Sequence, residues 1–387
     1  MEKTVKIIRF IRTVNPAYGG PIEGLKKVSE TLERMGHTTE VACLDSPEDP
    51  WTKDFPFKVY ALGPSKFKYG YSKKLVDWVI NNAVNYDAAI IHGIWQYQSF
   101  GAWRGLRKIQ KPYFVYTHGM LDPWFKKQYP LKHIKKWLYW PWADYRVIHN
   151  ARRVLFTSEE EKIKARSSFW LYKCNEAVVP YGTLPPDNER NHYIHQFTDA
   201  FPHLSDKKVF LFLGRIHEKK GCDILIRAFS KVAHLHDKLH LVIAGPDQSG
   251  WRLELQRLCE TLDITHRVTW TDMLTGDLKW GAYYHADAFV LPSHQENFGI
   301  SVAEALACGT PVLISDKVNI WREVQNDNSG IVSTDDLEGT IKNLTQWLSL
   351  STKDQDVIRN NAVATFDSRF NLEKSADSLL RILRCDE

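Results

Sequence analysis

Short apolar runs recur along the whole chain, and most of them end at glycine, proline or serine. They occupy residues 5–11, 39–44, 57–62, 87–92, 112–117, 153–157, 177–180, 208–214, 239–244, 267–270, 287–292, 310–314 and 329–332. Most are continuous rather than alternating, which is typical of strands buried on both faces of a parallel sheet. Stretches with amphipathic helical spacing lie between them, for example at residues 21–35 and 221–233. This alternation predicts an α/β fold of doubly wound parallel sheets.

Seven of these runs fall in the first half of the chain and six in the second, so we expect two Rossmann-like domains. The stretch between them is rich in proline, asparagine, aspartate and histidine and has no clear periodicity. We place an N-terminal domain at residues 1–183, a linker at 184–205, a C-terminal domain at 206–366, and a final helix at 367–387 that packs back toward the N-terminal domain. Because open sheets bind ligands at the carboxyl ends of their strands, two such domains facing each other predict a site in the cleft between them.

The composition argues against several classes of protein. The 387 residues are 43% hydrophobic and 25% charged, the balance of an ordinary soluble globular protein. A net charge of +5 is too even to indicate nucleic-acid binding. The six cysteines form no C-x-x-C pair, which argues against a zinc ribbon or a thioredoxin-type motif and favours free thiols in a reducing compartment. No apolar run approaches the roughly 20 residues of a membrane span, and the N-terminal run is too charged for a signal peptide, so we expect a cytoplasmic protein.

One chemical motif lies at residues 291–312, where a strand, a loop and a helix follow one another. The helix begins near Phe298–Gly299, and its free N–H groups and positive dipole end favour a phosphate at the strand end. Glu296 lies in the loop, where it can accept hydrogen bonds from sugar hydroxyls. Glu304 follows eight residues later and can accept from the two hydroxyls of a ribose. The spacing alone is equally compatible with a solvated loop glutamate and an ordinary helix glutamate.

A second motif, residues 209–221, places cations at the end of another strand. The strand ends at Gly214, and Arg215 and Lys220 follow. Cations fixed at a strand end can hold an anionic group such as a diphosphate and stabilise negative charge that develops on it. Surface cations after a strand are the alternative interpretation. After the first strand, Gly19–Gly20 lets the backbone approach a ligand closely, or simply forms a turn.

The segment 291–312 resembles the E-x7-E motif of retaining GT-B glycosyltransferases, and most of all that of family 4 of these enzymes. The resemblance implies that Glu296 contacts the transferred sugar and that Glu304 holds the ribose. It also implies that the backbone of Asn297, Phe298 and Gly299 contacts the sugar and the distal phosphate.

The resemblance extends to the other motifs. Residues 209–221 resemble the family's Gly-Arg…Lys-Gly motif, which implies that Arg215 and Lys220 hold the donor diphosphate. Gly19–Gly20 matches the family's glycine-rich loop. Residues 245–250 resemble the loop near the nucleobase, although Asp272 stands where the family usually has glycine, which leaves the base pocket undetermined. The chain has no G-x-G-x-x-G and no P-loop motif, which argues against a dinucleotide oxidoreductase and a P-loop NTPase.

The N-terminal half contributes candidates at two further strand ends. In YTHGMLDPW, residues 116–124, His118 ends a strand. In related enzymes a histidine at this place hydrogen-bonds the donor sugar beside the reacting carbon. Many of them continue with aspartate, whereas Asp122 comes later here. Asp122, His92 and Trp95 are our acceptor-side candidates, with structural packing as the alternative for each.

Residues 124–146 combine five lysines with Trp124, Trp137, Trp140 and Trp142. Interfacial segments mix cations and amphipathic aromatic rings in this way, so we expect peripheral contact with a membrane at its inner face. Pro141 interrupts any long helix, and packing of the aromatic rings inside the N-terminal domain is the alternative.

The resemblance implies a retaining, metal-independent glycosyltransferase, a hexosyltransferase with no cofactor, that moves a sugar from a nucleotide-diphosphate sugar to a hydroxyl. The acceptor we expect is a glycan or a lipid-linked molecule, as in polysaccharide biosynthesis. A GT-B sugar-nucleotide epimerase and a non-catalytic nucleotide-sugar-binding protein are the alternatives. A pyridoxal-phosphate phosphorylase is disfavoured because the chain is short and no lysine has a cofactor context. The donor base, the sugar, the linkage and the oligomeric state are not specified by the sequence.

Overall fold

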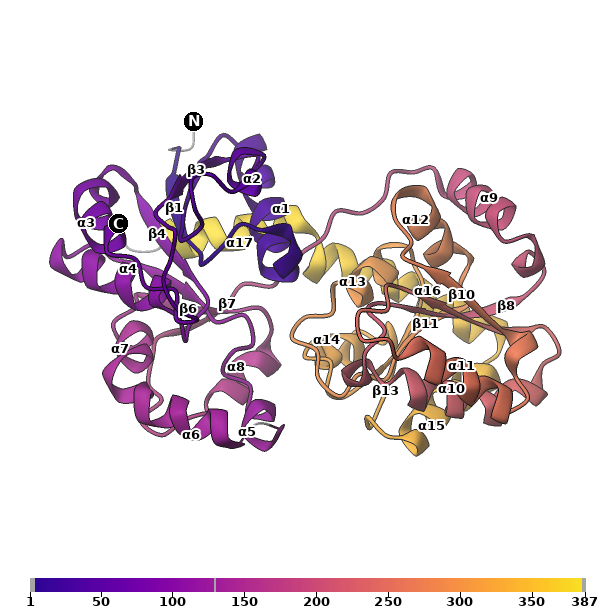
Figure 1. Ribbon diagram of the computed structural model, residues 1–387. Helices are drawn as coiled ribbons and strands as arrows, with labels where there is room; N and C mark the ends of the chain where they lie inside the picture. The colour runs from indigo at the N-terminus through magenta and orange to yellow at the C-terminus, as the bar shows by residue number, and fades with distance from the viewer. Residues whose placement is uncertain (1–3, 129, 385–387) are drawn as a thin grey trace. The chain divides into compact units, whose positions relative to one another are not determined.

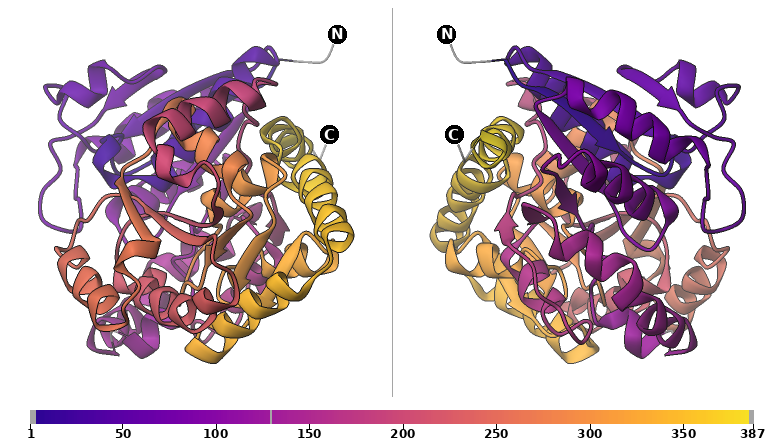
Figure 2. Two further views of the ribbon diagram at one scale, coloured as in Figure 1. Left: turned by 90° about the vertical axis from the view of Figure 1, so that its right-hand side faces the viewer. Right: turned by 90° about the vertical axis from the view of Figure 1, so that its left-hand side faces the viewer.

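The computed structural model describes residues 4–128 and 130–384, and it divides into two compact units (Figure 1). Unit 1 comprises residues 1–182 together with 372–387, and unit 2 comprises residues 183–371. Each unit has its own parallel sheet, and helices lie on both faces of each sheet (Figures 1 and 2). Among the described residues, no helix is both long and apolar enough to span a bilayer.

The sheet of unit 1 has the order β3-β2-β1-β4-β5-β6-β7, with every neighbouring pair parallel. Its strands are β1 (Lys6–Phe10), β2 (Thr38–Cys43), β3 (Lys58–Ala61), β4 (Ala88–His92), β5 (Phe114–Tyr116), β6 (Arg153–Phe156) and β7 (Glu176–Val178). Its helices are α1 (Gly20–Arg34), α2 (Pro50–Lys53), α3 (Lys74–Asn82), α4 (Tyr97–Lys108), α5 (Trp124–Gln128), α6 (Pro130–Tyr139), α7 (Asp144–His149), α8 (Glu159–Ala165) and α17 (Leu372–Arg384).

The sheet of unit 2 has the order β10-β9-β8-β11-β12-β13, again fully parallel. Its strands are β8 (Lys208–Leu213), β9 (Leu239–Ala244), β10 (Val268–Asp272), β11 (Ala288–Leu291), β12 (Val312–Ser315) and β13 (Gly330–Ser333). Its helices are α9 (Arg190–Ala200), α10 (Cys222–Val232), α11 (Arg252–Thr261), α12 (Gly276–His285), α13 (Ile300–Ala307), α14 (Trp321–Asn326), α15 (Leu337–Ser349) and α16 (Thr352–Thr365).

Each apolar run singled out in the sequence overlaps one of these thirteen strands, which confirms the two doubly wound sheets. The strands are continuous runs of apolar residues because helices bury both faces of each sheet. Strand β9, for example, is buried at every position. In both sheets the strand order reverses between the first and fourth strands, β1 and β4 in unit 1 and β8 and β11 in unit 2. Open sheets of this kind bind ligands outside the carboxyl ends of the strands at such a reversal.

Two segments near the division between the units differ in detail from the sequence interpretation. Residues 184–205, expected to be a linker, contain helix α9, whose Tyr193 and Phe197 are buried and which packs on α12 within unit 2. The final stretch consists of a short π-helix, Phe366–Phe370, followed by α17. Helix α17 packs on α1, so the end of the described chain belongs to unit 1 (Figure 1).

Candidate functional site

In unit 2 the loops after β8 and β11 approach each other so closely that only glycine fits at one position. Gly221, which caps α10, has φ +69°, and a Cβ there would lie 2.4 Å from the carbonyl oxygen of Pro292. Ser293 Oγ and the His294 N–H both donate to the carbonyl oxygen of Lys219, at 2.9 Å each. These contacts hold the loop bearing Arg215 and Lys220 against the loop bearing Glu296.

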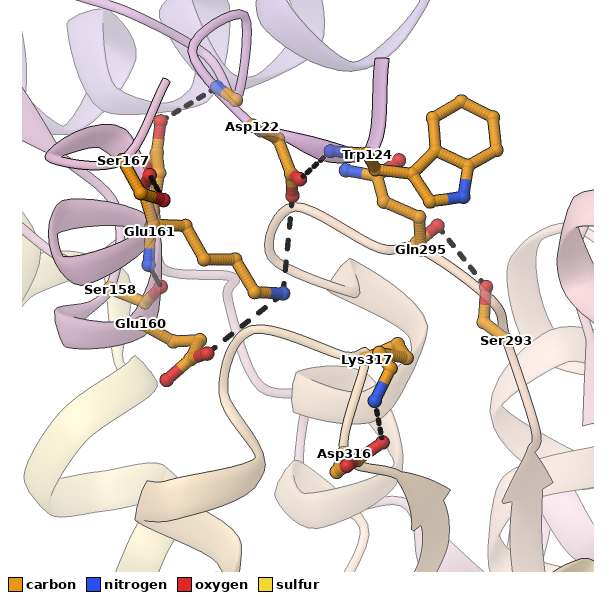
Figure 3. A network of polar contacts seen from close by, with 12 residues as sticks. Asp122, Trp124, Ser158, Glu160, Glu161, Ser167, Ser293, Gln295, Asp316 and Lys317 are labelled. Carbon is orange, nitrogen blue, oxygen red and sulfur yellow. Dashed lines mark hydrogen bonds and ion pairs between the residues drawn. The ribbon is translucent and has the colours of Figure 1, made fainter. Parts of the chain in front are cut away.

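Lys220 and Glu296 form an ion pair across these two loops. The Lys220 side chain is only 15% exposed, and burial, together with repulsion from Lys219 and Arg215, lowers the pKa of Lys220 to about 7. Glu296 itself is fixed by its backbone, because its N–H donates to Lys317 and its carbonyl accepts from Asn319, next to β12. Figure 3 shows the same loop from Ser293 to Gln295 with Lys317 and Asp316 beside it. The sequence-predicted cation and carboxylate therefore meet at the strand-end reversal.

Arg215 differs from Lys220 in being exposed. Within residues 4–128 and 130–384, no carboxylate pairs with its guanidinium. Its charge is nevertheless close enough to Lys220 to lower the pKa of that lysine. A second cation without a protein counter-ion at the mouth of the reversal is what an anionic ligand requires.

Helix α13 begins directly after this loop. Gly299 caps it in the left-handed region, φ +78°, and no side chain caps the N-terminus. The preceding Phe298 is buried, with its ring edge-on to Phe370 at 5.6 Å between centroids. Packing of Phe298 therefore fixes where the helix starts, and Asn297 and Gly299 lie at that start, as the sequence predicts.

Glu304 lies one turn into α13 and is 5% exposed. Its Oε1 accepts from Lys279 at 2.8 Å, and its Oε2 accepts from the Tyr283 hydroxyl at 3.2 Å. Each carboxylate oxygen has a second lone pair, so both can still accept a hydroxyl. The sequence did not point to Lys279 and Tyr283, since both come from α12 and neither stands in a recognisable motif.

The loop after β9 also lies tightly against the end of β8, at Gly214. A Cβ on Gly245 would lie 1.8 Å from the Gly214 carbonyl oxygen, and the Gly245 N–H donates to Asp272 at 2.7 Å. Asp272 has φ +56°, which gives the physical reason why glycine is usual at its position. Its carboxylate pairs with Arg252, whose guanidinium lies over the Trp270 ring. This Arg252–Asp272 pair is a feature the sequence interpretation missed.

In unit 1, four side chains form a chain of hydrogen bonds at the carboxyl ends of β1, β4 and β5. Arg9 Nη1 lies 3.2 Å from His92 Nε2, His92 Nδ1 lies 3.1 Å from His118 Nε2, and His118 Nδ1 lies 2.8 Å from the Tyr181 hydroxyl. Burial, with repulsion from Arg9, lowers the pKa of His118 to about 3; burial, with repulsion from His118 and Arg9, also lowers that of His92. His92 and His118 are thus brought together as neutral rings. Both ring nitrogens of His118 are occupied within unit 1, so contact with a sugar requires exchange of one of these bonds.

Glu161, on α8, holds the loop that carries His118. Its Oε1 accepts from Thr117 Oγ1 at 2.8 Å and from the Gly119 N–H at 2.6 Å. Its Oε2 accepts from both the N–H and the hydroxyl of Thr157 at 2.7 Å. Ser158 caps the same helix (Figure 3). The Ser-x-x-Glu spacing at residues 158–161 is a capping-box signal, but it gave no indication that the glutamate reaches another strand end.

The acceptor-side candidates are only partly brought together. His92 lies in the buried chain, while Trp95 donates from Nε1 to Met120 and packs against Trp140 and Phe169. Asp122 is 8% exposed and accepts from the Trp124 N–H at 2.8 Å (Figure 3). Asp122 also lines a pocket of about 220 Å³, whose other lining residues are Met120, Pro123, Lys132, His133, Lys136, Ser168 and Phe169.

Gly19 and Gly20 lie at the start of α1, after the short 3-10 turn Pro16–Tyr18. Gly19 has φ +71°, and a Cβ on either glycine would meet open space. The conformation of Gly19 therefore accounts for its glycine, while the open space beside the pair leaves room for a ligand to approach.

Two family descriptions match the chain. Residues 195–364 match the family described as Glycosyl transferases group 1, and residues 19–182 match the one described as Glycosyl transferase 4-like domain. Together with the two Rossmann-like sheets, these matches show that the chain belongs to the GT-B glycosyltransferases of the family 4 type.

Among curated proteins, an uncharacterized glycosyltransferase of Methanocaldococcus jannaschii is 38% identical over 126 residues, 33% of this chain and 32% of that one. D-inositol 3-phosphate glycosyltransferase of Mycobacterium marinum is 30% identical over 182 residues, 46% of this chain and 38% of that one. The match thus spans about a third of the length of these relatives. Among solved structures, Anabaena HepE in complex with UDP-glucose has a TM-score of 0.74 at 17% identity, covering 98% of this chain and 99% of that one.

Proposed function

We propose that this protein transfers a sugar from a nucleotide-diphosphate sugar to a hydroxyl acceptor, with retention of anomeric configuration and without a metal ion. The observation that carries the proposal is the Lys220–Glu296 pair at the strand reversal, beside Arg215 and the N-terminus of α13. A diphosphate and a sugar need this combination of fixed cations, helix N–H groups and a carboxylate. A structural neighbour bound to UDP-glucose and relatives named as glycosyltransferases support it.

In the proposed reaction the bond between the anomeric carbon and the diphosphate oxygen breaks, and the acceptor hydroxyl attacks on the same face. The leaving diphosphate keeps the bonding electron pair and takes the proton of the hydroxyl. Arg215 and Lys220 stabilise the charge that develops on the diphosphate, as does the dipole of α13. Glu296 orients the sugar through its hydroxyls. Glu304 holds the ribose, in addition to its bonds to Lys279 and Tyr283.

The acceptor we propose is a glycan or a lipid-linked molecule, and the setting is polysaccharide or lipid-linked glycan assembly at the cytoplasmic face of a membrane. In unit 1, we expect His118 to affect binding of the transferred sugar. We expect acceptor binding to depend on His92, Trp95 and Asp122. The lysines and the histidine around the pocket beside Asp122 suit an acceptor that carries negative charge.

The experiment that tests the donor site is thermal stabilisation of the purified protein in EDTA by UDP, GDP, ADP, CDP and NAD. A ligand at 100 times its dissociation constant adds about 2.7 kcal/mol to the free energy of unfolding. We expect one nucleoside diphosphate to stabilise the protein and NAD to have no effect. Stabilisation by NAD alone would contradict the proposal. Release of nucleoside diphosphate from a nucleotide sugar without any acceptor would instead favour an epimerase, and binding without turnover a non-catalytic protein.

A further inference from the structure

Helix α6 exposes the kind of apolar stripe that other helices of the protein bury. Leu131, Ile134 and Leu138 follow one another at intervals of three and four and lie on one face, and they are 77%, 55% and 62% exposed. The corresponding stripe of α1, which includes Leu25 and Leu32, is 0–6% exposed. An apolar helix face at this spacing normally packs on a partner.

Neighbouring aromatic side chains extend the stripe. Trp142, in the short 3-10 turn after α6, is 68% exposed, and Trp137 is 44% exposed. The Trp137 ring packs against Trp170 at 5.5 Å between centroids, and Trp170 is itself 47% exposed. We call Leu131, Ile134, Trp137, Leu138, Trp142 and Trp170 the α6 surface.

The α6 surface is held on a rigid base. Trp140 is fully buried, and its ring stacks on Phe169 at 4.8 Å between centroids. Its Nε1 donates to the carbonyl oxygen of Trp170 at 2.8 Å. Of the four tryptophans at residues 124–146, only Trp137 and Trp142 are exposed, so the sequence expectation and its packing alternative each describe part of the segment.

The charged side chains of residues 123–143 are all lysines, and the flanking Asp122 and Asp144 are buried. Residues 123–143 contain five lysines and neither aspartate nor glutamate. Lys126, Lys132 and Lys135 are exposed, with Lys135 directly beside Ile134 and Leu131 on the helix. A second copy of the chain would bring lysine against lysine on such a surface, whereas an anionic surface complements it.

We propose that the α6 surface docks on an anionic lipid bilayer, with α6 lying in the interface and its leucine, isoleucine and tryptophan side chains in the headgroup and acyl boundary. Apolar residues on one side of a helix with lysines beside them, and tryptophan at the edge, are suited to this position. Each lysine near an anionic surface contributes about fivefold to binding (about 1 kcal/mol). The proposal is independent of the sugar-transfer reaction, since it concerns binding of the protein without substrate.

The test is co-sedimentation of the full chain with extruded vesicles, without nucleotide. One set contains phosphatidylcholine with about a third phosphatidylglycerol, and the other contains phosphatidylcholine alone. We expect binding to the anionic vesicles, weakened by high salt because the attraction is partly electrostatic. Leu131→Ser, Ile134→Ser and Leu138→Ser together are expected to lower the partition coefficient at least tenfold, and Lys126→Glu with Lys135→Glu to do the same on anionic vesicles only.

The matched control is a triple variant of equally exposed apolar residues elsewhere: Val84→Ser, Leu235→Ser and Leu253→Ser, which are 58%, 52% and 58% exposed in the native protein. Its partitioning is expected to equal that of the unaltered chain. Calorimetry of each variant, with the transition of unit 1 unchanged, shows that the unit bearing α6 is folded. Thermal stabilisation of unit 2 by the nucleoside diphosphate separates a failure of this proposal from a failure of the donor site. Equal binding of the α6 variant and the control would overturn the proposal. A dimer that the α6 variant abolishes, without vesicle binding, would also overturn it.

Discussion

The guanidinium of Arg9 sets the direction of the hydrogen bonds that run from Arg9 to Tyr181. Arginine only donates, so His92 Nε2 must accept. His92 then carries its proton on Nδ1 and donates it to His118 Nε2, which leaves His118 to donate from Nδ1 to Tyr181. Arg9 is 1% exposed, and its Nε and Nη2 atoms make no hydrogen bond among the described residues. A buried cation of this kind is costly, which indicates a function beyond packing.

We therefore predict that Arg9→Met changes the tautomers of two histidines. In the unaltered protein at pH 7, His92 and His118 are expected to be neutral and protonated on Nδ1. In the variant, Nε2-protonated forms should appear, since nothing then obliges His92 Nε2 to accept. Two-dimensional ¹H–¹⁵N spectra of protein with ¹⁵N-labelled histidine distinguish the two forms, and His92→Gln assigns the signals. Arg107→Met, on the exposed side of α4, is the control. Unchanged tautomers in Arg9→Met would show that Arg9 does not set them.

The Lys220–Glu296 pair carries the second residue-scale prediction. Glu296→Gln and Lys220→Met should each lower turnover by about a hundredfold or more, because each removes an interaction with the developing charge or the transferred sugar. Lys219→Ala is the matched control: the side chain is adjacent, and the backbone carbonyl of Lys219, which accepts from the β11 loop, is kept in the variant. It should stay within a few-fold of the native rate. Turnover is measured by nucleoside diphosphate release with acceptor present, and near-native rates in both variants would refute the assigned roles.

The pKa of Lys220 predicts proton uptake on ligand binding. In the free protein this pKa is about 7, so at pH 8 most of the lysine is neutral. A bound diphosphate favours the charged form and raises the pKa, so binding at pH 8 should take up as much as about one proton, and affinity should fall as pH rises above 7. Titration calorimetry in buffers of different ionisation enthalpy measures the number of protons taken up on binding. Lys220→Met should abolish the uptake, and an unchanged uptake would assign it to another group.

Residue by residue, the sequence was informative where a side chain stands in a motif at a strand end. Glu296, Arg215 and Lys220 were predictable because their motifs follow apolar runs directly. Arg9 and Glu161 were not. Arg9 lies inside an apolar strand and Glu161 in a helix, and their partners come from distant parts of the chain. Only the folded arrangement of strand ends brings such residues together.

At the scale of elements, buried parallel strands are easy to predict because both of their faces demand apolar side chains. Helix α9 shows the opposite case. Tyr193 and Phe197 are its buried residues, four positions apart, in an otherwise polar stretch that resembles a linker. Helix α9 is stabilised by packing on α12. The two backbones approach so closely that a Cβ on Gly281 of α12 would come within 2.1 Å of the Tyr193 carbonyl oxygen. Close approach of two helix backbones depends on that glycine, and no local pattern in α9 reveals it.

The contact between the β8 and β11 loops provides a prediction at this scale. Gly221→Ala has to adopt φ +69° and also displace the Pro292 carbonyl, so the free energy of unfolding should fall by roughly 3 kcal/mol or more. Gly250 has a similar φ of +74°, but a Cβ there would meet open space. Gly250→Ala should therefore lower the free energy of unfolding by only about 1–2 kcal/mol. Urea unfolding compares the two. Equal losses would mean that the loops separate easily, and that their contact does not determine the position of Lys220.

At the scale of the whole molecule, the chain passes from unit 1 to unit 2 at residue 183 and returns to unit 1 at residue 372. The return is fixed by helix α17, in which Leu372, Ala376, Leu379 and Leu380 are 0–3% exposed. Ser375 Oγ donates to the Pro180 carbonyl oxygen, so the two places where the chain changes unit lie together in unit 1. The sequence interpretation already expected the final helix to pack toward the N-terminal domain. The spacing of leucines in α17 predicts the helix itself, but not that it covers α1.

Removal of α17 should therefore destabilise unit 1 while leaving the donor site of unit 2 intact. A chain that ends at Asn371 loses three buried leucines, each contributing about 2 kcal/mol through its burial, which is comparable with the whole stability of a domain. Calorimetry should show the transition of unit 1 lowered or lost, whereas the transition of unit 2 should still rise with nucleoside diphosphate. Lys374→Ala with Arg381→Ala, both on the exposed side of α17, should change neither transition. Loss of nucleotide stabilisation in the shortened chain would instead mean that the donor site depends on unit 1 being folded.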